Sequence, residues 1–301
     1  MTALQERLIN LPCWQGAVSL APLAGGLTNI SFVATDGAGK FVVRCGEDIP
    51  VHGIFREHER VVAVAVFEAG LSAEPVYFEP GVMVLRYIDG RTLDEADLRH
   101  ELRRIVALLK ICHREVGPRL KGKVASFNVF EVIRRYVRLL KEGDSSFSSD
   151  LPRYLEMADT LEAAQMPMPI VFGHNDLLPG NLINDGKRLW LIDWEYAGFG
   201  SALFDLANLA ANGSFQGAAD TALLEAYFGR PVTDEVQRSF DAMKAASALR
   251  EANWAMVSHI HMCTAGIDYL AHARDHLARA DAAWSVFQHR HGKPRDRGLL
   301  R

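Results

Sequence analysis

The sequence predicts an α+β protein in two lobes, a small and mainly antiparallel β lobe followed by a larger, mainly helical lobe. Residues 18–45 and 75–90 contain β-rich runs separated by glycine turns. From residue 201 to residue 291, nearly every segment places apolar residues at helical spacing. The 301 residues also exceed what one hydrophobic core usually organises. We therefore expect a first lobe of residues 1–90, with a hinge near 86–90, and a second lobe of residues 91–301.

Strands and one helix account for the first lobe. The run VSLAPLAGGLTNISFVATDGAGKFVVRC, residues 18–45, predicts antiparallel strands interrupted at Gly25-Gly26 and at the turn 36–39. The next run, FREHERVVAVAVFEAG, has helical spacing and stops at Gly70, where a helix commonly ends. Strand character returns in PVYFEPGVMVLRYIDG, and Asp89-Gly90 closes this run as a turn.

Helix start signals mark the second lobe. Thr92 followed by Glu95 fits a capping box, in which the two side chains satisfy backbone amides at a helix start. Asn128 and Glu131 repeat the signal for a helix that ends near Gly143. The helical pattern then continues to residue 291, apart from the segment 170–195. We expect the cleft between the lobes to bind ligand.

Composition excludes several classes of function. The 33 basic and 37 acidic residues give a net charge of -4, too little field to collect nucleic acid or an anionic membrane surface. No run approaches the roughly 20 apolar residues that span a bilayer, and the N-terminus lacks a signal-peptide pattern. We expect a cytoplasmic protein whose partner is a small molecule, with no nucleic acid and no membrane insertion. The sequence does not indicate an oligomeric state.

The spacing of the four cysteines also fits a cytoplasmic protein. No two of them form a C-x-x-C pair, so neither a zinc knuckle nor a redox site is indicated. We read them as buried thiols of a reducing cytosol. They are Cys13, Cys45, Cys112 and Cys263.

The segment IVFGHNDLLPGNLINDGKRLWLIDWEYAGFG, residues 170–200, carries the chemistry. His174, Asp176 and Asn181 have the H-x-D-x-x-x-x-N spacing of kinase catalytic loops, and Asp193 follows an apolar strand. Phosphoryl transfer needs a carboxylate to accept the proton of the attacking hydroxyl, and oxygen ligands to hold Mg²⁺. Asp176 is the candidate base. Asn181 and Asp193 are the candidate ligands of Mg²⁺, with ATP as the phosphoryl donor.

Loop punctuation is the alternative explanation, because Asn, Asp and Gly are common in turns. A lone H-x-D would be read that way. The complete spacing, followed by IDWEYAG between strand and helix signals, favours the catalytic interpretation.

Through GHNDLLPGN and IDWEYAG, the sequence resembles the choline/ethanolamine kinase family within the aminoglycoside phosphotransferase-like enzymes, and the resemblance covers nearly the whole chain. The resemblance implies a protein-kinase-like bilobal fold. It also implies ATP- and Mg²⁺-dependent phosphorylation of a small amino-alcohol, choline or ethanolamine first. Thiamine or another amino-alcohol comes second and an aminoglycoside third.

The resemblance also assigns residues around the phosphates. GGLTN, with Gly25, Gly26, Thr28 and Asn29, looks like the family's substitute for the kinase glycine-rich loop, although it departs from G-x-G-x-x-G. Two glycines let the backbone approach phosphate oxygens, but a plain hairpin turn is the alternative. Arg44, in FVVRCG, stands where choline kinase-like sequences commonly have arginine and would bind the α- and β-phosphates.

An inward-facing Arg44 needs an anionic partner. The R-x-x-E spacing from Arg56 favours Glu59, and Glu57 stays possible. A charge facing water at the strand edge is the alternative for Arg44.

The remaining nucleotide-side assignments concern adenine and the loop. Backbone groups of the hinge Arg86-Tyr87-Ile88 would read the adenine edge, with Ile192 beneath the ring. Asp205, in FDLANLA, resembles the aspartate that braces a kinase catalytic loop. We expect it to support His174 and the loop backbone structurally.

Aromatic residues are the candidates for the acceptor site. Trp194, Glu195 and Tyr196 directly follow Asp193 and so should lie beside the transferred group. The resemblance adds Trp254 and Tyr269, at places where choline kinase-like enzymes have the aromatic residues of their substrate pocket. Aromatic faces and a carboxylate, here Glu195, would recognise a quaternary ammonium. Core packing of the two late aromatics is the alternative.

Three pairs of closely spaced histidines could suggest a metal site, but the sequence does not support one. The pairs are His259 with His261, His272 with His276, and His289 with His291. An i,i+4 pair such as His272 and His276 could bind zinc, but no cysteine or third ligand is evident. We therefore expect surface or packing roles and no zinc.

Two other kinds of protein fit the pattern less well. A kinase-like protein that binds a ligand without catalysis would normally lose Asp176, Asn181 or Asp193, and all three are present. A protein kinase would carry D-F-G and A-P-E elements, which this sequence lacks.

Overall fold

The first strands of the chain form one antiparallel sheet, as the sequence predicts. The computed structural model describes residues 2–26, 28–143, 145–262 and 266–292. The strands lie in the order β1-β2-β3-β5-β4. Their bounds are β1 (Ser19–Leu23), β2 (Ile30–Asp36), β3 (Gly39–Cys45), β4 (Pro75–Glu79) and β5 (Val82–Arg86). The turn between β2 and β3 forms because the Asp36 carboxylate accepts the amides of Ala38 and Gly39.

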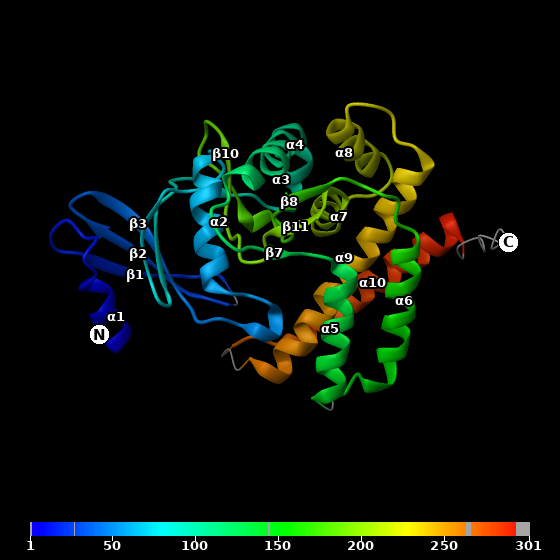
Figure 1. Ribbon diagram of the computed structural model, residues 1–301, viewed down its shortest axis with the longest axis horizontal. Helices are drawn as coiled ribbons and strands as arrows, with labels where there is room; N and C mark the ends of the chain where they lie inside the picture. The colour runs from blue at the N-terminus through cyan, green and yellow to red at the C-terminus, as the bar shows by residue number, and fades with distance from the viewer. Residues whose placement is uncertain (1, 27, 144, 263–265, 293–301) are drawn as a thin grey trace.

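The alternation of side chains along β3 gives the sheet two different faces. Phe41 and Val43 are buried in an apolar cluster with Leu8, from helix α1 (Ala3–Ile9), and with Leu11. Because side chains on a strand alternate between faces, Arg44 points to the opposite side of the sheet. That side faces the second lobe (Figure 1).

Helix α2 (Arg56–Glu68) follows the short 3-10 helix η1 (Pro50–His52) and stands between the sheet and the other helices (Figure 1). Its buried residues Val62, Ala65 and Val66 belong to the large apolar cluster of the second lobe, and not to the cluster of the sheet. The sequence pattern assigns this helix to residues 1–90 and does not show that its apolar face packs on the other lobe. The boundary at residue 90 stays a prediction.

Helices dominate the rest of the chain, as predicted. The α-helices are α3 (Glu95–His100), α4 (Leu102–Ile111), α5 (Val129–Glu142), α6 (Leu151–Ala163), α7 (Ala202–Asn212), α8 (Ala218–Phe228), α9 (Asp234–His261) and α10 (Tyr269–His291). Short turns of helix are η2 (Cys112–Val116), η3 (Gly117–Arg119), η4 (Ser148–Asp150) and η5 (Pro179–Asn181). Helices α9 and α10 pack along each other, and the C-terminal end of α10 lies far from the five-stranded sheet (Figure 1).

The helix starts agree with the sequence at one position and differ at another. Asn128 caps α5 by accepting the amides of Phe130 and Glu131, so this helix begins where the sequence predicts, while the Glu131 side chain pairs with Arg134. The capping box predicted at Thr92 and Glu95 is wrong. Thr92 lies in a strand, and the reciprocal pair is formed two residues later by Asp94 and Asp97.

Two small sheets frame the segment that carries the predicted catalytic residues. One has the order β10-β9-β6, with β6 (Arg91–Thr92), β9 (Leu182–Asn184) and β10 (Leu189–Leu191). The other has the order β7-β11-β8, with β7 (Ala125–Ser126), β8 (Ile170–Gly173) and β11 (Gly198–Ser201). Because β6 pairs with β9, the chain just after the predicted hinge is hydrogen-bonded to the catalytic segment.

Two further expectations concern membranes and thiols. Among the described residues, no helix is long and apolar enough to cross a membrane. Cys45 and Cys112 are buried as expected, and Cys13 is half-buried. Cys263 lies outside the described residues.

His52, at the end of η1 in the first lobe, contacts two helices of the second lobe. Its Nδ1 lies 3.1 Å from the Tyr136 hydroxyl on α5, and its Nε2 lies 3.0 Å from Ser258 Oγ on α9. Its ring also packs on Trp254 at 5.2 Å between centroids. Burial and the nearby Arg250 and Arg135 lower the pKa of His52 to about 3, so the imidazole is neutral in the folded protein.

The depressed pKa of His52 predicts a loss of stability in mild acid. Above the unfolded-state pKa of about 6.5, both states hold a neutral imidazole and the group contributes no pH dependence. As the pH falls from about 6.5 toward 3, the unfolded state binds a proton that the folded state refuses. The free energy of unfolding should therefore fall by about 1.4 kcal/mol per pH unit from this group.

Denaturant unfolding at pH 7.5 and 5.5 measures this effect. The drop in stability between the two pH values should be smaller in His52→Gln than in the wild type. The exposed His100 provides the control, because His100→Gln should keep the wild-type drop. Equal drops in the wild type and His52→Gln would contradict the assignment.

Candidate active site

The loop after β8 is held by the buried carboxylate of Asp205, on α7. One oxygen of this carboxylate accepts the amide of His174 at 2.9 Å, and the other accepts the amide of Asn175 at 2.7 Å. His113 Nε2 lies 2.8 Å from the same carboxylate. Burial alone would raise the pKa of Asp205, but these partners bring it below its ordinary value. The brace predicted for Asp205 is therefore formed by an ionised, buried side chain.

Two local features let the loop approach this carboxylate. A Cβ on Gly173 would lie 3.0 Å from Asp205 Oδ2, so glycine leaves the space that the contact needs. Asn175 has a φ of +64°, a conformation that asparagine adopts more readily than most residues. The turn sequence GHND is thus required by the local geometry.

His174 is a structural residue of this loop. Its Nδ1 accepts the amide of Asp176, so Nε2 carries the proton and donates to the carbonyl of Ile192 at 2.9 Å. The ring packs on Trp194 at 4.7 Å between centroids. Burial lowers the pKa of His174, which keeps this imidazole neutral. Its two hydrogen bonds join the loop of Asp176 to the strand that precedes Asp193.

The same contacts bring the candidate base and metal ligands together. The Asn181 side-chain amide donates to the carbonyl of Asp176 at 2.9 Å. The amide of Ile192 donates to the carbonyl of Asn181 at 2.9 Å. This bond brings Asp193, the residue after Ile192, close to Asn181. Asp193 has a φ of +65°, so its backbone is held in the left-handed region. An amide oxygen and a carboxylate, the types of ligand that Mg²⁺ accepts, thus come from neighbouring segments, and one oxygen of the carboxylate contacts Arg44.

Arg44 reaches from the sheet into this region and pairs with carboxylates of both lobes. Its Nη1 lies 2.5 Å from Glu59 Oε1, and its Nη2 lies 2.7 Å from Asp193 Oδ1. Glu57, the alternative partner, is exposed and pairs with Arg60. The structure therefore assigns Arg44 an inward position and Glu59 as its partner.

Glu195 lies on the same side as Arg44. Thr28 Oγ1 donates to its carboxylate at 2.9 Å, and Asn29 Nδ2 does so at 3.2 Å. Arg56 Nη1 lies 3.4 Å away and also contacts Glu59 at 2.8 Å. The sequence places Glu195 with the acceptor, whereas its contacts are with the loop predicted to cover the phosphates. Leu27 of that loop lies outside the described residues.

The predicted hinge residues connect β5 to β6. The amide of Arg86 donates to the carbonyl of Glu74, and the amide of Tyr87 donates to that of Lys40. The Arg86 guanidinium lies over the Phe41 ring at 4.6 Å. Two of the three hinge amides are therefore used inside the protein, and Ile88 is the third.

The predicted acceptor aromatics gather, but they are buried. Trp254 Nε1 donates to the Tyr196 hydroxyl at 2.8 Å, and the rings of Trp254 and Tyr269 are 6.0 Å apart. Both residues are 4 % exposed. Trp194 is equally buried, and its Nε1 donates to the carbonyl of Leu191. The structure thus packs Tyr196, Trp254 and Tyr269 together, whereas Trp194 packs on His174.

Two charged residues that the sequence analysis did not select lie beside Asp176. Arg250 is 1 % exposed, and its Nη1 lies 3.5 Å from Asp176 and 2.7 Å from Glu251. Its guanidinium also lies over the Tyr196 ring at 4.5 Å, and its Nε and Nη2 have no partner among the described residues. The sequence does contain a signal for these two residues. In ASALREANWAMV, a charged pair stands inside an apolar helical run, and buried charges need partners.

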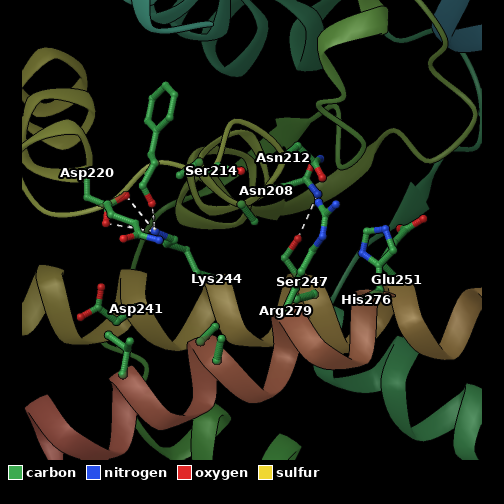
Figure 2. Close-up of a pocket in the computed structure, with 18 of the residues that line it drawn as sticks. Asn208, Asn212, Ser214, Asp220, Asp241, Lys244, Ser247, Glu251, His276 and Arg279 are labelled. Carbon is green, nitrogen blue, oxygen red and sulfur yellow. Dashed lines mark hydrogen bonds and ion pairs between the residues drawn. The ribbon is translucent and has the colours of Figure 1, made fainter. Parts of the chain in front are cut away.

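A cavity of about 290 Å³ opens between α7, α8, α9 and α10, next to this pair (Figure 2). Asn208 Oδ1 accepts the amide of Leu177, and Asn212 Nδ2 donates to its carbonyl, so the cavity wall is joined directly to the residue after Asp176. Glu251 lies at one end, and the ion pair of Lys244 with Asp220 lies at the other (Figure 2). Charged side chains thus lie at both ends of the cavity, and the hydrogen bonds to Leu177 connect its wall to the backbone next to Asp176.

Comparisons with known proteins agree with this geometry. Protein LicA of Haemophilus influenzae is 29% identical over 210 residues, covering 67% of this chain and 61% of LicA. Ethanolamine kinase 2 of Mus musculus is 31% identical over 131 residues, or 40% of this chain and 34% of the mouse protein. The chain thus matches less than two thirds of the length of each. The crystal structure of a choline/ethanolamine kinase family protein from Mesorhizobium loti superposes with a TM-score of 0.73 at 26% identity.

That superposition covers 95% of this chain and 97% of the Mesorhizobium protein, so the two share the kinase-like bilobal fold over nearly all of this chain. The sequence profile of the choline/ethanolamine kinases matches residues 20–222, a span that includes Arg44, Asp176, Asp193 and Asp205. The chain therefore belongs to the choline/ethanolamine kinase family.

Proposed function

We propose that this protein transfers the γ-phosphoryl group of ATP to the hydroxyl of a small amino-alcohol, choline or ethanolamine. The observation that carries the proposal is the placement of Asp176 beside Asn181 and Asp193, opposite the pair of Arg44 and Glu59. Family membership supports the same reaction. A cytoplasmic location is part of the proposal, because the reaction consumes ATP.

The sheet side of the cleft would bind the nucleotide. Arg44 offers two guanidinium nitrogens to the α- and β-phosphates, and Glu59 holds its side chain in place. Gly25 and Gly26 have φ values of +111° and +86°, which other residues rarely adopt, so they allow the loop backbone to approach the phosphates. Adenine would meet the hinge at Ile88, with Ile192 beneath the ring.

Asn181 and Asp193 would hold Mg²⁺, because an amide oxygen and a carboxylate are ligands that this ion accepts. When bound, the ion neutralises charge on the phosphates and helps to orient them.

Asp176 would accept the proton of the acceptor hydroxyl. Burial raises the pKa of this carboxyl, and the Arg250 guanidinium opposes the rise. The hydrogen bonds from the Asp176 amide to His174 and from Asn181 to the Asp176 carbonyl fix the backbone that carries the base. Orientation of the hydroxyl against the phosphoryl group then supplies much of the rate.

The acceptor would bind beside Asp176, with its ammonium group toward Glu251, at the end of the cavity of Figure 2 that lies next to Arg250. This replaces Glu195 as the acceptor-side carboxylate, because Glu195 is held by Thr28, Asn29 and Arg56. The buried rings of Trp254 and Tyr269 would form the wall behind the site.

Release of ADP tests the reaction. Ethanolamine or choline should stimulate ADP release by the wild type more than thiamine or an aminoglycoside does. Asp176→Asn should lower kcat by about 10²–10⁴-fold with nearly unchanged ATP affinity, because only the proton acceptor is lost. No stimulation by either amino-alcohol, or wild-type turnover in Asp176→Asn, would contradict the proposal.

Removal of the Asp193 carboxylate tests the metal ligand. Asp193→Ala should bind ATP more weakly, and added Mg²⁺ should no longer strengthen binding, because one ligand is gone. Titration of ATP at several Mg²⁺ concentrations measures this. Glu57→Ala, an exposed change, should behave as the wild type. Retention of the wild-type Mg²⁺ dependence in Asp193→Ala would reject the assignment.

Neutralisation of Glu251 tests the acceptor site. Glu251→Gln should raise KM for the amino-alcohol by about 10- to 100-fold, because the ammonium group loses the carboxylate charge that faces it, while KM for ATP changes little. Glu225→Gln, exposed on α8, is the matched control. An unchanged amino-alcohol KM would place the ammonium elsewhere.

A further inference from the structure

Glu251 also lies close to two histidines that the proposed phosphoryl transfer does not use, so a metal ion held there would share this carboxylate with the acceptor site. His272 and His276 are one turn apart on α10, and their rings are 4.4 Å apart between centroids. His272 Nε2 lies 3.3 Å from Glu251 Oε1 on α9. One donor atom from each of the three residues lies within 4.8 Å of the others. Two imidazoles and a carboxylate thus converge from two helices.

The sequence analysis rejected zinc for the pair His272 and His276 because it found no third ligand. That premise is wrong, since the packing of α9 against α10 supplies Glu251. The residues are 21 and 25 positions apart in the chain, so spacing alone could not reveal the cluster.

We propose that Glu251, His272 and His276 form a binding site for a divalent transition-metal ion such as Zn²⁺. Two imidazoles and one carboxylate suit Zn²⁺ and other divalent first-row transition-metal ions, whereas Mg²⁺ prefers oxygen ligands and waters. The site is therefore chemically distinct from the one assigned to Asn181 and Asp193.

The surroundings provide the other requirements of such a site. Glu251 uses Oε2 for Arg250 and Oε1 for His272, so a metal would take the oxygen that now faces the imidazole. Glu251 and His276 line the cavity of Figure 2, which gives a path of entry and room for water as a further ligand. Arg279, the cation one turn from His276, is paired with Asp275 at 2.9 Å. Small side-chain rotations would bring the three atoms to bonding distance.

Metal binding to the untagged full-length protein tests the proposal. After treatment with a chelator, calorimetric titration with Zn²⁺ in excess Mg²⁺ should show one site per chain. Substitution by Co²⁺ should give the visible absorption of a low-coordinate Co²⁺ ion with imidazole ligands. His272→Gln and His276→Gln should each weaken Zn²⁺ binding at least about 10-fold, because each removes a ligand.

The matched control is His289→Gln, an exposed histidine farther along α10, which should bind Zn²⁺ as the wild type does. Circular dichroism checks that each variant is folded, and His272→Asn provides a second change at the more exposed ligand. The proposal is overturned if the wild type binds no Zn²⁺, or if folded His272 and His276 variants bind it with wild-type affinity.

Discussion

The carboxylate of Asp205 accepts the amides of two consecutive residues, His174 and Asn175, and contacts His113, all away from water. A buried charge is stable only when such partners surround it. The need to satisfy it fixes the loop backbone, and the loop in turn sets the position of Asp176. The His174 ring extends this control to Ile192, the residue before Asp193. Base and metal ligand thus share one support.

A second set of charges joins the lobes. Arg44 and Arg56 come from the first lobe with Glu59, and Asp193 and Glu195 come from the second. Removal of these ions from water is costly, and their mutual contacts offset that cost only in one arrangement. Three carboxyl groups face two guanidinium groups where phosphates are proposed to bind, and burial together with Asp193 raises the pKa of Glu195 to about 7. When the proposed nucleotide binds, Arg44 and Arg56 would exchange contacts with Asp193 and Glu195 for contacts with phosphate oxygens.

Much of this could be predicted because the residues are neighbours in sequence. His174, Asp176 and Asn181 lie in one loop, and the spacing after Arg56 favours Glu59 over Glu57 as the partner of Arg44, which the structure bears out. The direction of Glu195 could not be predicted, since it depends on a loop about 167 residues earlier. Arg250 and Glu251 were missed because a single turn of α9 shows its charges but not what faces them. Tertiary packing decided each of these outcomes.

The membership of α2 in the larger apolar cluster has a mechanical meaning. Glu59 is anchored on the helical side, together with Asp193, while Arg44 is carried by the sheet. Both of the short ion pairs of Arg44 therefore cross the same boundary. A tilt of the sheet away from the helices would lengthen both ion pairs of Arg44 at once, so the two pairs together resist separation of the sheet from the helices.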